Sequence, residues 1–444
     1  FKQKTAYEIM PSLVGSEMCI RDSGWGPQCL YMFMNRIYNV MDNYVLIAIP
    51  LFIFMANILE RSGVAEKLFD SFRLLLGPLR GGVAVAVVIV CTLFAACTGI
   101  IGASVVSMSL LAMPTMLKYG YQKELTTGTI AAGGTLGILI PPSIMLVVMG
   151  DQARLSVGKL FVGAVLPGLV LSALYIIYIL LRCLINPKLG PALSPEERKM
   201  YSLITRISQS VKYLVPPMIL ILGVLGSIFF GVATPTEAAA VGAFLAFVMM
   251  LVYRRFSWKA ITEAIWQTAK TNCMVIIILC GATCFTGVFL GIGGGDVIKD
   301  LLLGLGLGKW GIFWIMMLIV FILGMFIDWI GIVLITFPIF LPIARQLGFD
   351  PLWFVIMIAI NLQASFLTPP FGYALFYLKG TAPEGVTIMD IYKGIIPFVF
   401  LMICGLLICV IFPSLSLWLP SPVSYTHLRA HETRHDLVCR LLLE

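Results

Sequence analysis

The sequence predicts an all-α polytopic membrane protein that contains two inverted repeats, each with a re-entrant hairpin and a broken helix. Of its 444 residues, 60% are hydrophobic and only 12% are charged, whereas soluble domains are about a quarter charged. Apolar runs such as 211–230, 274–290 and 395–411 approach the roughly 20 residues that span the hydrocarbon core. These runs do not alternate apolar and polar residues, which excludes a transmembrane β-barrel.

The expected elements follow from the apolar runs and from the residues that interrupt them. In the first half they are a helix over 44–59, an amphipathic interfacial stretch over 60–82, a hairpin over 83–116, a broken helix over 126–150 and a full helix over 160–182. In the second half they are helices over 213–231, 235–253 and 272–291, a hairpin over 311–344, a broken helix over 352–379 and a helix over 394–412.

The second half repeats the first at a constant displacement of 228 residues. Three sets of positions show it: Pro114 and Pro342, Gly120 and Gly348, and Pro141-Pro142 and Pro369-Pro370. We therefore divide the chain into a first repeat (24–182), a cytoplasmic loop with a linker helix (183–234) and a second repeat (235–420). Inverted repeats with broken helices are typical of secondary transporters.

The two ends of the chain differ in composition from the rest. Residues 1–23 and 421–444 resemble translated sequencing-adapter or linker sequence, so we exclude them from the fold. The second segment holds all three histidines, and their helical spacing is therefore not interpreted as a metal site. Helix 235–253 shifted by 228 falls on 7–25, so we expect the native chain to start near Gly24 here and to lack its first membrane helix.

The basic residues predict the sidedness of the membrane protein. If the two hairpins enter and leave on the same side, the loops of one face hold 18 Lys and Arg residues and those of the other face hold six. The positive-inside rule makes the first face cytoplasmic. The six on the outer face are Arg36, Arg154, Lys159, Lys299, Lys309 and Arg345.

Four interruptions are the candidate functional sites: "TGIIGAS" (98–104), "GTLGILIPPS" (134–143), "IDWIG" (327–331) and "NLQASFLTPPFG" (361–372). Unwound backbone at membrane depth exposes carbonyl oxygens, which suit a hard cation such as Na⁺, and helix N-termini, which suit an anion. The alternative for each break is a simple Pro or Gly kink. Four breaks in one repeating register favour two cation sites that flank one substrate site.

Hard oxygen ligands and flexible backbone define the candidate residues. The candidate cation-binding residues are Thr98, Gly99, Gly102, Ser104, Gly137, Pro141, Asp328, Gly331, Asn361, Thr368 and Pro369, and the candidate substrate-binding residues are Thr135, Ser143, Gln363 and Ser365. Asp328 is the main acidic residue at a hairpin tip, where a carboxylate is a functional candidate. Its alternative role is to cap the second arm of the hairpin.

Several chemistries are excluded or disfavoured. Thr234, Pro235 and Glu237 fit a helix start with a capping box, so we assign Glu237 a structural role. No Walker motif is present, which excludes ATP hydrolysis by this chain. No histidine lies between residues 24 and 420, which disfavours most membrane enzymes. We expect no enzyme activity, no cofactor and no transition metal, with Na⁺ as the coupling ion.

Four motifs carry a resemblance to a known family. The stretches "IPLFIFMANILERSG" (49–63), "GTLGILIPPSIMLVVMGD" (134–151), "GVATPTEAAAVG" (231–242) and "NLQASFLTPPFGYALFYLKG" (361–380) resemble the large membrane subunit of tripartite ATP-independent periplasmic (TRAP) transporters. The wording is most similar to the branch labelled mannitol/chloroaromatic uptake. The resemblance covers about residues 28–420.

The resemblance implies an elevator-type ion transporter in the bacterial inner membrane, driven by Na⁺ gradients. It implies a small four-helix membrane subunit and a periplasmic solute-binding protein as partners, and a small organic anion with a carboxylate as substrate; nucleic acid is not a partner. Two alternatives stay open. One is an ion-coupled carrier that needs no binding protein. The other is an ATP-driven importer permease, for which "EAAAVG" lacks the required glycine, because Ala243 stands there.

Overall fold

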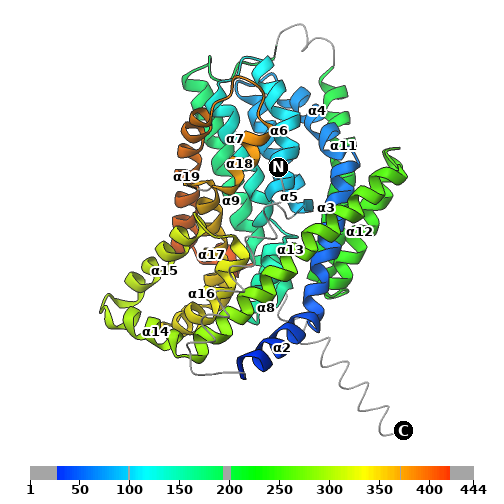
Figure 1. The fold of residues 1–444 in the computed structure, drawn as a ribbon. Coiled ribbons are helices and arrows are strands. Elements are labelled where there is room, and N and C mark those ends of the chain that lie inside the picture. The colour runs from blue at the N-terminus through cyan, green and yellow to red at the C-terminus, as the bar shows by residue number, and fades with distance from the viewer. Residues whose placement is uncertain (1–27, 99–100, 194–201, 371, 421–444) are drawn as a thin grey trace.

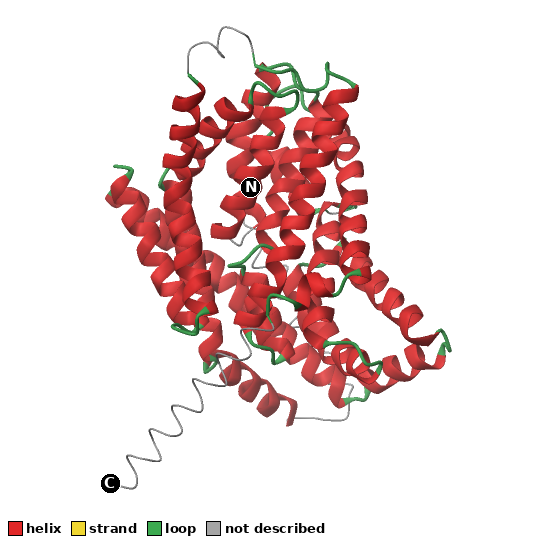
Figure 2. Cartoon of the chain, turned by 180° about the vertical axis from the view of Figure 1, so that it is seen from behind, coloured by secondary structure: helices red, strands yellow, loops and turns green. Residues whose placement is uncertain are grey.

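The computed structural model describes residues 28–98, 101–193, 202–370 and 372–420, and within them every regular element is a helix (Figures 1 and 2). Seven helices are long and apolar enough to cross a membrane: Tyr44–Arg61, Val157–Ile185, Ile204–Phe229, Pro235–Val252, Trp258–Gly291, Trp329–Gln346 and Ile388–Ile411. The predicted all-α polytopic fold is confirmed. The terminal segments 1–23 and 421–444 lie outside the described residues.

The first repeat begins with helices that flank the membrane interface and continues into the hairpin and the broken helix. Its elements are α2 (Gln28–Met41), η1 (Tyr44–Ile47), α3 (Ala48–Arg61), α4 (Val64–Leu76), α5 (Gly82–Thr98), α6 (Ile101–Lys118), α7 (Lys123–Thr135), η2 (Leu136–Ile138), α8 (Ile144–Ala153) and α9 (Val157–Ile185). The hairpin is α5–α6, and the broken helix is α7–η2–α8.

A linker helix, α11 (Leu203–Phe229), leads to the second repeat. The remaining elements are α12 (Pro235–Val252), α13 (Trp258–Gly291), α14 (Gly294–Gly304), α15 (Gly308–Gly324), α16 (Trp329–Gln346), α17 (Pro351–Leu367), α18 (Tyr373–Thr381), α19 (Ile388–Ile411) and α20 (Ser414–Leu417). The hairpin is α15–α16, and the broken helix is α17–α18. The capping box predicted at the start of α12 is present: Glu237 accepts the backbone N–H of Thr234 at 2.7 Å.

The displacement of 228 residues holds throughout the structure. Adding 228 to the bounds of α6 gives the bounds of α16, and the same shift places α7 on α17, α8 on α18 and α9 on α19. The shift also pairs the amphipathic helix α4 with α14. In Figure 1, α4 lies near the top of the molecule and α14 near the bottom. Equivalent elements therefore lie at opposite ends, and the predicted inverted repeats are confirmed.

The structure differs from the sequence prediction around α13. This helix is continuous over 34 residues, whereas we expected only 272–291, and its first-repeat counterpart is split into α2 and η1–α3. Asn43 causes the split, because its side chain accepts the N–H of Val45 at 3.0 Å and caps η1. The shifted position is Thr271, inside α13. Helix α14, which begins in the glycine-rich "GIGGGD", was not predicted.

Contacts between the repeats hold the two broken helices together. The half-helix α18 packs against the hairpin arm α6, and its counterpart α8 packs against α16. Helices α7 and α19 pack so closely that a Cβ on Gly128 would overlap the carbonyl of Gly394. A second group forms where α3 packs against both α12 and α13, and α11 against α12, seen on the right of Figure 1.

The approach of α7 to α19 gives a test of the packing. We expect Gly128→Ala to lower the free energy of unfolding by about 1–3 kcal/mol, because the added methyl group overpacks this contact. Thermal unfolding of the detergent-solubilised chain measures the effect. Gly226→Ala in α11 is the matched control, since nothing lies within 4 Å of its added Cβ. Equal melting temperatures for the two variants would contradict the close contact.

Candidate functional site

The two broken helices meet at one pair of symmetry-related residues. Gln363 of α17 donates its side-chain Nε2–H to the backbone carbonyl oxygen of Thr135 at 3.0 Å, and the two residues are 228 positions apart. Equivalent residues of two repeats can touch only near the pseudo-symmetry axis. Both side chains are fully buried. The predicted substrate-binding residues Thr135 and Gln363 therefore lie together at the centre of the repeat arrangement.

The first break is enclosed by protein. Helix α7 ends at Thr135, whose Oγ1 donates to the carbonyl of Ala132 at 2.9 Å. The chain passes through Gly137 and Pro141, and α8 begins after Ser143, whose Oγ donates to the carbonyl of Ile138 at 2.5 Å. Every residue of the break is buried. Irregular backbone at membrane depth is tolerated under this condition.

The second break is more open. Helix α17 ends at Leu367, and Thr368 follows as its C-cap with Oγ1 donating to the carbonyl of Ala364 at 2.7 Å. Thr368 is half-buried and Pro369 is exposed. Gly372, with a φ of 48°, turns the chain into α18. The equivalent breaks thus differ in exposure, although each contains the double proline.

Each hairpin packs beside the broken helix of its own repeat. In the first repeat Ser104 is buried, and the side chain of the next residue, Val105, fills the space beside Gly134 of α7. In the second repeat Gly324 ends α15 and leaves just enough room for the side chain of Ser365 of α17. The predicted residues Ser104 and Ser365 therefore flank the Thr135–Gln363 contact from opposite repeats.

Tyr377 of α18 links the two hairpins and was missed by the sequence analysis. A Cβ on Gly102, near the start of α6, would lie 3.0 Å from the Tyr377 ring. Asp328, at the tip of the other hairpin, lies near enough to Tyr377 for electrostatic interaction. Tyr377 is 44% exposed. Its position one helical turn after Tyr373, the first residue of α18, was the available signal, because residues four apart share a face.

The remaining predicted residues have structural contacts of their own. Asp328 is the N-cap of α16 and accepts the N–H of Ile330 at 3.4 Å, so the capping role is present. Gly331 lies in the first turn of α16. Asn361 donates to the carbonyl of Met317 at 2.7 Å and ties α17 to α15. Gly99 and the side chain of Thr98 lie outside the described residues. Cation binding by these residues stays a prediction.

One buried polar atom has no protein partner at this centre. Gln363 is fully buried, and its Oε1 forms no hydrogen bond within the described part of the chain. A buried acceptor without a partner costs about 1–3 kcal/mol, so such atoms point to a binding role. Among the described residues no group of three or more His, Cys, Asp and Glu side chains could hold a metal ion. The centre is therefore lined by neutral oxygen atoms.

Comparison with known proteins assigns this arrangement to a family. The family described as "Tripartite ATP-independent periplasmic transporter, DctM component" matches residues 13–415. The chain belongs to the DctM family. As the large permease component of a TRAP transporter it is a multi-pass protein of the bacterial inner membrane, in agreement with its seven candidate spans.

Relatives of known name agree with this assignment. The chain is 33% identical over 402 residues to the C4-dicarboxylate TRAP transporter large permease protein DctM of Pseudomonas aeruginosa, covering 89% of this chain and 91% of that protein. It is 27% identical over 381 residues to the sialic acid TRAP transporter large permease protein SiaM of Vibrio cholerae, covering 86% and 87%. These permeases are named for different solutes, so membership of the family does not identify the substrate.

A solved structure shares the fold. The YdaH transporter of Alcanivorax borkumensis superposes with a TM-score of 0.62 at 14% sequence identity, covering 87% of this chain and 88% of that one. At this identity the likeness shows a common architecture.

The contact between Gln363 and Thr135 can be tested by substitution. We expect Gln363→Met, which is similar in size, to lower the free energy of unfolding by about 1–3 kcal/mol, because the buried carbonyl of Thr135 loses its donor. Thermal unfolding in detergent measures the loss. Gln267→Met is the control, because Gln267 is exposed on α13. If both variants melt with the wild type, the contact does not stabilise the centre.

Proposed function

We propose that this chain is the membrane subunit of a Na⁺-coupled, binding-protein-dependent secondary transporter that imports a small organic anion with a carboxylate by an elevator mechanism. The observation that carries the proposal is the meeting of two inverted broken helices at Thr135 and Gln363. Broken helices at the interface of inverted repeats are where substrates and coupling ions bind in secondary transporters.

The chemistry at the centre supports Na⁺ as the coupling ion. The hydroxyl groups of Ser104, Thr135 and Ser365 and the free Oε1 of Gln363 are hard, neutral ligands. Asp328 is an acidic residue at the tip of the α15–α16 hairpin. Hard oxygen donors favour alkali and alkaline-earth cations over transition metals. A bound Na⁺ would supply a donor-like partner for the buried Gln363 oxygen.

The unequal exposure of the two breaks supports alternating access. The break of the first repeat is buried, whereas Pro369 in the second is exposed. Because the repeats are inverted, exchanging their conformations would open the first break toward the other side of the membrane. The hairpins and broken helices, which pack together, form the mobile part in this proposal. Helices α3, α11 and α12 form the scaffold.

Two partners complete the proposed transporter. The TRAP family name implies a small membrane subunit and a periplasmic binding protein. The isethionate TRAP transporter permease protein DctMQ of Oleidesulfovibrio alaskensis is 32% identical over 382 residues, and the chain spans about three-fifths of its length (59%). Helix α11 has an exposed apolar stripe against which a small subunit can pack: Ile204, Ile207, Val211, Val215, Ile219 and Leu222.

Reconstitution tests the proposed function. Proteoliposomes would contain this chain with its small subunit, and the labelled carboxylate would be one that raises the melting temperature of the binding protein. We expect uptake only with an inward Na⁺ gradient and with binding protein present. Uptake without the binding protein would favour an independent ion-coupled carrier. Uptake that requires ATP and ignores the Na⁺ gradient would contradict the proposal.

Substitution of Asp328 separates its two possible roles. We expect Asp328→Ala to abolish Na⁺-dependent uptake while the protein stays inserted in the membrane. Asp328→Asn retains an N-cap side chain but removes the charge, and we expect it to lose Na⁺-dependent uptake as well. Asp350→Asn is the matched control, because Asp350 caps α17 by accepting the N–H of Trp353 at 3.0 Å. Full Na⁺-dependent uptake by Asp328→Asn would leave Asp328 with a capping role only.

A further inference from the structure

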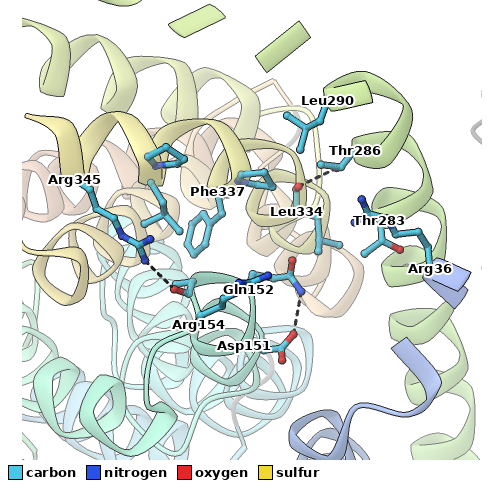
Figure 3. A pocket seen from close by; sticks show the side chains of 14 residues that line it. Arg36, Asp151, Gln152, Arg154, Thr283, Thr286, Leu290, Leu334, Phe337 and Arg345 are labelled. Atoms are coloured by element: carbon cyan, nitrogen blue, oxygen red, sulfur yellow. Dashed lines mark hydrogen bonds between the residues drawn. The ribbon is translucent and has the colours of Figure 1, made fainter. Parts of the chain in front are cut away.

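A cavity of about 480 Å³ lies apart from the Thr135–Gln363 centre, between helices of both repeats (Figure 3). Arg36 comes from α2, Arg154 directly follows α8, and Arg345 comes from the last turn of α16. The other lining residues are Asp151, Gln152, Ala153, Thr283, Thr286, Leu290, Leu334, Phe337, Pro338, Leu341 and Pro342. The three arginines are half of the six basic residues that the charge distribution places on the outer face.

The arginines are not neutralised within the described part of the chain. No carboxylate there lies within salt-bridge distance of Arg36, Arg154 or Arg345. The single carboxylate in the cavity wall, Asp151, is occupied by amides: it accepts Asn43 Nδ2 at 2.6 Å and Gln152 Nε2 at 2.9 Å. The three cations and one anion give the wall a formal charge of +2.

Arg345 has a structural contact that leaves most of its donors available. Its Nη2 donates to the carbonyl of Ala153, in the last turn of α8, at 3.3 Å. A guanidinium group carries five N–H donors, so this bond orients the group and uses one of them. The carbonyl ends of α8 and α16 offset roughly half a charge each, which leaves the cavity cationic.

The rest of the wall suits an organic anion more than an inorganic one. Leu334 and Phe337 form an apolar wall, and the hydroxyl group of Thr286 is already bonded to the carbonyl of Leu334 at 3.0 Å. The volume lies within the range of about 300–1,000 Å³ that is usual for small-molecule sites. Arginine pairs with carboxylates through parallel hydrogen bonds. A short carboxylate with a hydrocarbon portion matches both parts of the wall.

Two elements connect this cavity with the central breaks. Helix α8 begins after Ser143, at the first break, and reaches the cavity at its other end, about 15 Å along the helix. Helix α16 begins at the hairpin tip with Asp328 as its cap and contributes Arg345 from its last turn. The two helices belong to different repeats and pack against each other. The cavity therefore lies at the far ends of the elements that bound the central site.

We propose that this three-arginine cavity is an outer receiving site for a small organic carboxylate, separate from the site at Thr135 and Gln363. Its role in uptake rests on the proposed transport function, whereas binding of the anion does not. An acidic surface of a binding protein is the competing occupant. The small anion is favoured because the cations surround an enclosed volume with an apolar wall.

Arginine modification measures binding directly. The purified full chain in nanodiscs, without an ion gradient, would be treated with p-hydroxyphenylglyoxal, and each modified arginine quantified by mass spectrometry. We expect saturating succinate to slow modification of Arg154 and Arg345 by about threefold or more, because a bound ligand excludes the reagent. Uncharged succinamide should have no effect. Arg73 is the internal control, since it donates to Tyr119 at 2.5 Å on the opposite face.

Three results would overturn the proposal. Equal protection by sodium chloride of the same ionic strength would indicate screening, and absence of protection would remove the site. Protection that appears only with the binding protein would make the cluster a protein-docking surface. The matched variants are Arg154→Gln, which should remove the protection of Arg345, and Lys299→Gln, an outer-face change outside the cavity, which should not.

Uptake distinguishes this proposal from the transport function. We expect Arg154→Gln to raise the half-saturating substrate concentration for uptake in proteoliposomes several-fold, and Lys299→Gln to leave it unchanged. If uptake proves independent of Na⁺ while succinate still protects Arg345, the proposed coupling fails and the receiving site stands. If uptake is Na⁺-dependent and protection is absent, the receiving site fails and the transport function stands.

Discussion

Backbone that leaves the helix inside a membrane must find its hydrogen bonds within the protein, and this constraint shapes the whole molecule. The double prolines at 141–142 and 369–370 prevent the chain from satisfying its own backbone by continuing the helix. Each break is therefore supported by side-chain hydroxyls and by the opposite repeat. The bond from Gln363 to the carbonyl of Thr135 is the point at which one repeat supports the other. An ordinary helix bundle does not need such support.

The inverted symmetry makes this support economical and also leaves it incomplete. The hairpin of each repeat packs beside its own broken helix, and its second arm packs against the half-helix of the other repeat. The sequences at the equivalent positions nevertheless differ: the residue opposite Gln363 is Thr135, which offers a carbonyl and a hydroxyl in place of an amide. One break is enclosed and the other is exposed. Identical halves would have no such difference, and it is what a transporter with two access states requires.

The outer cavity adds electrostatics to this geometry. The broken helices carry few charges, because desolvating a charge at membrane depth is expensive. The cations gather instead where α8 and α16 reach the face with fewer basic residues (Figure 3). A carboxylate held there would be concentrated at the ends of the two helices whose other ends border the central site. Attraction at the surface and neutral coordination in the interior are thus assigned to different parts of the same elements.

The sequence by itself determined the features that depend on local chemistry. Hydrophobic runs set the membrane helices, Thr234 and Glu237 set the start of α12, and the paired prolines set the breaks and their displacement of 228 residues. Local patterns also misjudged α13, because a polar first half gave no apolar run to follow, and α14, because its glycines resemble a loop. Only the tertiary structure decided which separated residues meet: Gln363 with Thr135, Tyr377 with both hairpins, and three arginines around one cavity. These contacts join residues from different helices, so no periodicity along the chain encodes them.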